Sequence, residues 1–124
     1  MSMLGVIAEE LKKIDVPYEF MRWTSTPTYP YWIGEYSETA VFTEDGYKEN
    51  TVTLTGTTKG AWLELEQART KIEKHFHPIC GLRKSTDEGA VLIFYENSFP
   101  VPTGEEDLKR IQINLKIKEW KGMI

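Results

Sequence analysis

Residues 108–120, which read LKRIQINLKIKEW, carry the clearest structural signal in the chain. Apolar residues occupy every second position of its central part, namely Ile111, Ile113, Leu115 and Ile117. The positions between them are polar, namely Gln112, Asn114, Lys116 and Lys118. Because successive side chains of a β-strand point to opposite faces, this alternation predicts a strand with one buried and one solvated face. Such strands are typical of antiparallel sheets that are covered on one side only.

Shorter segments upstream of this strand also have strand-like patterns. They are rich in aromatic or β-branched residues, and they cover residues 18–23, 31–36, 51–55, 82–86 and 90–96. Thr43-Glu44-Asp45-Gly46 and Asp87-Glu88-Gly89 are turn signals, because Gly after an acidic residue supplies the positive φ of a tight hairpin. The expected loops are residues 24–30, 37–50 and 97–107.

Two segments show the helical period instead. The apolar stripe of the first consists of Leu4, Ile7, Ala8, Leu11 and Ile14. Ser2 is its expected N-cap, and Val16-Pro17 ends it because the residue before proline avoids the α region. The stripe of the second consists of Ala61, Leu65, Ala68, Ile72 and Phe76. It predicts a helix from Ala61 to His75, with an N-cap at or near Thr58.

These elements follow one another in the order α-β-β-β-α-β-β-β. The connections between strands are mostly of hairpin length, so we expect a mostly antiparallel sheet with two helices packed on one face. A length of 124 residues suits one core. The sequence therefore predicts a single α+β domain that spans residues 1–124.

Composition narrows the function classes. A net charge of −4 argues against a nucleic-acid site built on phosphate neutralisation. The single cysteine excludes an intramolecular disulfide. The lack of disulfides is typical of proteins in a reducing compartment. The apolar runs are shorter than the roughly 20 residues of a membrane helix, and charged residues come too early for a signal peptide. We therefore expect a cytoplasmic protein that binds no membrane.

Candidate chemistry is sparse. His75, His77 and Cys80 are the only cluster that could bind a metal or form a thiol–imidazole pair. A zinc site would also need a second pair of Cys or His ligands, and the sequence contains none. We interpret them as two helix-ending histidines beside a buried cysteine. Residues 56–60 lack the phosphate-binding glycine pattern. We therefore predict no catalytic, cofactor-binding or metal-binding residue, no cofactor, and a protein that is not an enzyme.

Several segments resemble a known family. Residues 16–17 entering the first strand and residues 29–36 (YPYWIGEY) are similar to the head-to-tail joining proteins of long-tailed bacteriophages. This is the tail-completion or tail-terminator group of phages and prophages of Gram-positive bacteria. Other matching segments are residues 43–46, 54–58 leading into 62–66, 99–104 and 108–120. The resemblance covers roughly residues 11–122.

The resemblance implies an α/β domain that assembles into a ring, usually of six subunits, on the phage tail. Such a ring caps the tail tube, stops its growth and docks it to the neck of the head. Its partners would be copies of itself, the tail tube protein and a neck protein, while DNA passes through without specific binding. The virion tail or neck would be its location, with the bacterial cytoplasm during assembly. Our candidate assembly-contact residues, in two expected loops, are Glu44, Asp45, Tyr47, Phe99 and Val101.

Other interpretations remain open. Within the virion, the chain could be a neck or stopper component or a relative of the tail tube. Outside it, the aromatic residues of 29–36 could form the platform of a small bacterial ligand-binding domain. A metal or cysteine enzyme at His75, His77 and Cys80 is the remaining alternative.

Overall fold

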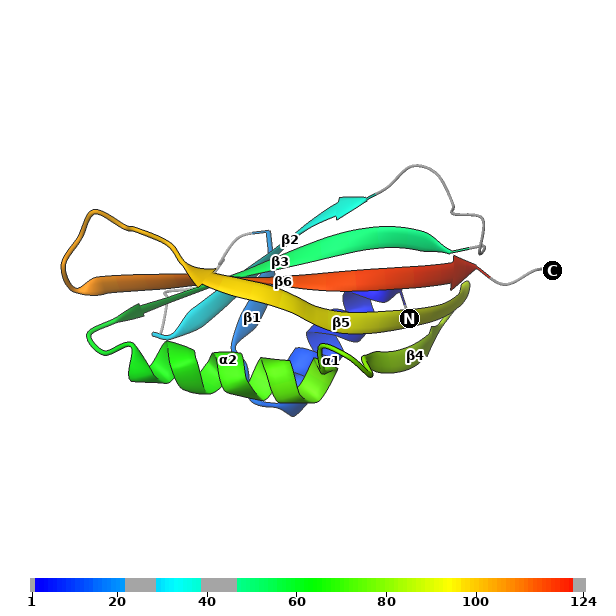
Figure 1. Ribbon diagram of the computed structural model, residues 1–124, viewed down its shortest axis with the longest axis horizontal. Helices are drawn as coiled ribbons and strands as arrows, with labels where there is room; N and C mark the ends of the chain where they lie inside the picture. The colour runs from blue at the N-terminus through cyan, green and yellow to red at the C-terminus, as the bar shows by residue number, and fades with distance from the viewer. Residues whose placement is uncertain (1, 22–28, 39–46, 122–124) are drawn as a thin grey trace.

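The computed structural model describes residues 2–21, 29–38 and 47–121 (Figure 1). Its elements confirm the predicted order and the α+β fold. They are α1 (Met3–Lys13), β1 (Tyr18–Phe20), β2 (Tyr31–Glu38), β3 (Lys48–Lys59), α2 (Leu63–Phe76), β4 (Leu82–Thr86), β5 (Gly89–Pro100) and β6 (Leu108–Lys121).

One sheet organises the described residues. Its strand order is β1-β2-β3-β6-β5-β4, so the last strand in sequence lies between β3 and β5. Every pairing is antiparallel except that of β1 with β2. Both helices lie on the same side of this twisted sheet, and the molecule is elongated along its central strands (Figure 1).

The core lies between the sheet and the two helices. The four alternating apolar residues of β6 are all buried, with Ile111 at 3% exposed and the other three at 0%. From the neighbouring strands they meet Val52, Leu54, Val91 and Ile93, and from the helices Ile7, Leu11, Leu65, Ile72 and Phe76. The predicted alternation of β6 is therefore confirmed, and so is the stripe of α2 except for Ala61, which is exposed ahead of the helix. The stripe of α1 was predicted only in part, because Ala8 is exposed and the buried face is formed by Met3, Val6, Ile7, Glu10 and Leu11.

Several boundaries differ from the predictions. β3 and β5 are longer than expected, and β5 continues through Asn97–Pro100, which we had placed in a loop. β6 extends far enough to pair with these residues, and Pro100 is tolerated because the outer side of β5 has no strand partner there among the described residues. The expected turn at residues 43–46 lies outside the described residues.

The start of α2 was also predicted wrongly. The helix begins at Leu63, and Trp62 occupies the N-cap position without a side-chain hydrogen bond. Thr58 instead belongs to β3, where it is buried and donates a hydrogen bond from its hydroxyl to Glu64 Oε2 at 3.2 Å. The hydroxyl thus binds a side chain of the first turn rather than a free backbone amide.

The predicted N-cap of α1 is confirmed, because Gly5 N donates to Ser2 Oγ at 3.2 Å. Ser2→Ala removes the acceptor of one otherwise unpaired amide and is expected to cost about 1 kcal/mol of folding free energy. Urea denaturation measures the loss. Ser2→Asp should retain most of the stability because its carboxylate also caps and favours a helix N-terminus. Equal losses in both variants would contradict the assignment.

Candidate functional site

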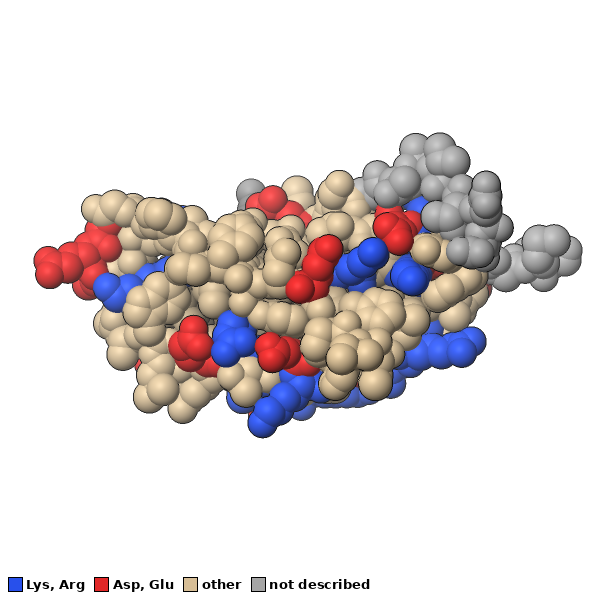
Figure 2. Space-filling model, in the orientation of Figure 1, with Lys and Arg blue, Asp and Glu red and all other residues tan. Residues whose placement is uncertain are grey.

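The face of the sheet turned away from the helices is a polar surface with side-chain bonds between its strands. Thr53 Oγ1 donates to Asn114 Oδ1 at 2.9 Å, and Asn114 Nδ2 donates to Asn97 Oδ1 at 2.9 Å, so one chain of side-chain bonds crosses three strands. Lys116 Nζ lies 3.5 Å from Glu49 Oε1 on the same face. Figure 2, which shows a side of the molecule that includes α2 as well as the sheet, has acidic and basic side chains interspersed.

An aromatic cluster closes one end of this face. The rings of Tyr47 and Trp120 lie 5.4 Å apart, and Lys118 Nζ lies over the rings of Tyr47 at 4.9 Å and Phe94 at 5.8 Å. Tyr47, one of the candidate contact residues, is therefore half-buried and held by neighbours. Glu44 and Asp45 lie outside the described residues.

The other two candidate contact residues lie at the opposite end of the molecule. Phe99 was expected in a loop, but it belongs to β5 opposite Gln112, and its side chain is 45% exposed. Val101 follows β5 and is half-buried, and its N–H donates to Arg110 O at 2.9 Å. The structure thus separates the candidate contact residues: Tyr47 lies near the chain termini, and Phe99 and Val101 lie near the β5–β6 connection.

The histidine and cysteine cluster is split between separate partners. His75 Nε2 lies 3.1 Å from Glu10 Oε1. His77 has a φ of 59° and accepts hydrogen bonds at Nδ1 from the backbone amides of Ile79 and Cys80, at 3.1 and 3.0 Å. Cys80 is exposed, so our expectation of a buried cysteine was wrong. The side chain of His77 shapes the turn, which carries the thiol into solvent.

Glu10 is the most unusual polar residue that the sequence reasoning missed. Its carboxylate is 3% exposed and contacts Lys13 at 2.8 Å, His75 at 3.1 Å and Lys84 at 3.8 Å. Burial alone would raise its pKa, but hydrogen bonds from Lys13 and His75 and the charge of Lys84 together lower the pKa below its ordinary value. Glu10 lies outside the predicted stripe of α1, and only the observed buried face, which also contains Met3, Val6, Ile7 and Leu11, includes it.

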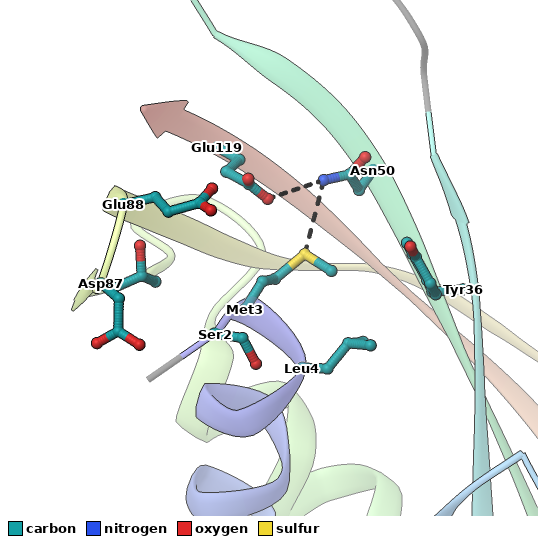
Figure 3. Close-up of a pocket in the computed structure, with 9 residues that line it drawn as sticks. Ser2, Met3, Leu4, Tyr36, Asn50, Asp87, Glu88 and Glu119 are labelled. Atoms are coloured by element: carbon teal, nitrogen blue, oxygen red, sulfur yellow. Dashed lines mark hydrogen bonds between the residues drawn. The ribbon is translucent and has the colours of Figure 1, made fainter. Parts of the chain in front are cut away.

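A cavity of about 260 Å³ opens at the N-terminus of α1 (Figure 3). Met3, Leu4 and Tyr36 form its apolar walls, and its acidic residues are Asp87, Glu88 and Glu119. Buried Asn50 donates through Nδ2 to Glu119 Oε2 at 3.3 Å and to Met3 Sδ at 3.6 Å. This lining suits a cationic or amine group more than an anion.

The aromatic platform predicted for a ligand does not form one surface. Trp32 is fully buried beneath the sheet, whereas Tyr36 is 41% exposed at the cavity and lies 6.3 Å from the ring of Phe20. Tyr29 and Tyr31 pack against each other at 5.5 Å. In the described part of the chain, no group of three or more His, Cys, Asp or Glu residues could hold a metal ion.

Comparisons add no family assignment. No protein-family model matches the chain, and a search of curated proteins finds no match. Neither helix in the described ranges has the length and apolar content needed to cross a bilayer.

Exposed apolar side chains mark a second kind of candidate site. Several large ones are at least 37% exposed, namely Phe20, Met21, Tyr29, Tyr36, Trp62, Leu63, Ile79 and Phe99. They lie at the end of β1 and just after it, before and on β2, at the start of α2, in the connection from α2 to β4, and near the end of β5. Apolar surface left in water in this way is typical of protein–protein contacts.

Proposed function

We propose that this chain is a structural protein of a phage or prophage virion, namely a tail-terminator or tail-completion protein. It forms a ring on the tail tube, stops tube growth and joins the tail to the neck of the head. The observation that carries this proposal is exposed apolar surface, with Met21 after β1 at 60%, Leu63 at the start of α2 at 63% and Ile79 between α2 and β4 at 81% exposed. The sequence resemblance supports the same role.

The polar face of the sheet is consistent with this role. A ring around a DNA channel needs a surface that neither binds the duplex tightly nor collapses onto it. With a net charge of −4, the chain offers phosphates no overall electrostatic attraction. The interstrand bonds of Thr53 and Asn114 keep the surface ordered while it stays hydrated. On this proposal the protein acts through contact surfaces and carries out no catalytic step.

Deleting the gene from the phage or prophage tests the proposal. Lysates should contain overlong or headless tails by negative-stain electron microscopy, because uncapped tubes continue to grow and cannot join heads. Expression of the unmodified chain from a plasmid should restore normal particles. A neck or stopper protein would instead leave tails of normal length beside DNA-filled or leaking heads. Normal infectious virions from the deletion strain would overturn the proposal.

A further inference from the structure

At each outer edge of the sheet, a short strand covers only part of the longer strand beside it, and we call this change a step. On one side, β1 covers only Trp32–Gly34 of β2, and the rest of β2 has no outer strand partner among the described residues. On the other side, β4 covers only Gly89–Ile93 of β5. Phe94–Pro100 of β5 therefore also presents an outer edge to which no described strand is paired. Exposed edges of this kind bind additional strands readily.

The strand register assigns each residue at the two edges to a level along the central strand β6. Through β2 and β3, the three residues of β1 lie level with Ile111–Ile113. The open edge of β5 lies level with 111–116, and β4 lies level with 117–121. If two copies lie side by side, β1 of one copy and β4 of the next both lie between β2 of the first copy and β5 of the next. They occupy different levels there, so they do not overlap. The steps of the two edges therefore do not clash, and neither short strand reaches the level of residues 114–116.

Strand direction agrees with this arrangement. β1 runs parallel to β2, and three antiparallel pairings separate β2 from β5, so β1 and β5 run in opposite directions. Rotation about an axis parallel to the strands preserves these directions in every copy. The β1 strand of one copy would therefore meet β5 of the next as an antiparallel pair, which has straight interstrand hydrogen bonds.

The side chains on the two edges are also suited to association. Phe20 and Met21, at the end of β1, are 39% and 60% exposed, and Phe99, on the open edge of β5, is 45% exposed. Phe20 lies level with Ile113 on the helix-covered face and Phe99 lies level with Gln112 on the helix-free face, so a contact between the edges would cover part of each ring on a different face of the joined sheet. The outward backbone groups of Phe20 in β1 and Ser98 in β5, which lie at the same level, would gain partners at the same time. Pro100, which lies level with Tyr18, has no N–H and can only accept a hydrogen bond.

We propose that β1 of one copy adds to the open edge of β5 in the next copy, which joins the sheets of successive subunits head to tail. The inference rests on the proposed ring-forming function and names its interface. Because different edges meet, the contact is heterologous and closes into a ring when the rotation allows it. The open edge of β5, residues 94–100, is about 24 Å long, and with a two-layer thickness of roughly 20 Å it gives about 480 Å² per copy. That is well below the roughly 800 Å² of a standard stable interface, so the tail would help to complete the ring.

A pair of engineered cysteines tests the interface. Glu19 and Phe99 lie at the same level of the sheet, and alternation places both side chains on the helix-free face. Within one chain they are four strand spacings apart, about 19 Å along the sheet, which is beyond disulfide reach. Glu19→Cys/Phe99→Cys in a Cys80→Ser background, oxidised at high protein concentration, should give a reducible ladder of dimers and larger multimers.

Glu19→Cys/Gln67→Cys is the matched control, because Gln67 is exposed on α2, away from both edges. It should give at least tenfold less multimer. In the unmodified protein, amide exchange in residues 94–99 should slow as concentration rises, which tests the contact without any substitution. Equal cross-linking of both pairs, or exchange that does not depend on concentration, would overturn the interface. A clear ladder together with normal virions from the deletion strain would instead retain the interface and remove the proposed function.

Discussion

Replacing Gly56 with alanine is expected to destabilise the fold by about 3 kcal/mol, although an alanine in a strand is ordinarily favoured over glycine. Gly56 in β3 lies opposite Trp32 in β2, and the indole ring covers the glycine. A Cβ at this position would lie 2.6 Å from three atoms of that ring. Trp32 is fully buried, so the ring cannot move aside without disturbing its other neighbours. Urea denaturation measures the loss.

Gly104→Ala is the matched control. Its added Cβ meets no atom within 4 Å, and its φ of 79° leaves only a backbone cost of about 1 kcal/mol. In the Gly56→Ala background, Trp32→Leu should cost less than in the wild-type protein, because the smaller side chain relieves the clash. A Gly56→Ala protein as stable as the wild type would show that the indole does not pack on the glycine.

The fold could be predicted because its main signals are local and mutually consistent. The alternation in β6 fixes one buried face, and the stripes of α1 and α2 supply the helices that cover it. The errors arose where tertiary contacts override local signals. Pro100 and its neighbours read as a loop, yet the long β6 recruits them into β5 because an edge position does not need the missing proline N–H.

Candidate contact surfaces could be predicted only in part. Phe99 was named from the sequence, but its place on an open strand edge depends on the step between β4 and β5, which only the register reveals. Ile79 was not singled out, because its 81% exposure follows from the turn that His77 holds. Exposure of an apolar side chain is a property of the assembled fold. Spacing along the chain does not encode it directly.

Glu10→Gln is expected to cost about 1.5 kcal/mol at neutral pH, because the buried side chain loses its charge-assisted hydrogen bonds while its basic partners stay partly in water. Glu10 links α1 to α2 through His75 and to β4 through Lys84. Its pKa is lower in the folded protein than the ordinary value of 4.5. The carboxylate therefore stabilises the fold above about pH 4.5, and this contribution disappears as the pH falls through the folded-state pKa. The stability difference between wild type and variant should shrink in the same acidic range.

Glu66→Gln separates this buried contact from an ordinary surface ion pair. Glu66 also bonds a basic residue of its own helix, Arg69, at 3.3 Å, but its side chain is 50% exposed. Its loss should cost about 0.5 kcal/mol or less and should leave the acid limb of the stability curve unchanged. Equal losses in the two variants, or a Glu10→Gln deficit that persists unchanged at pH 3, would mean that the charge of Glu10 does not hold the helices to the sheet. Packing of Ile7 and Leu11 would then account for the docking of α1 without it.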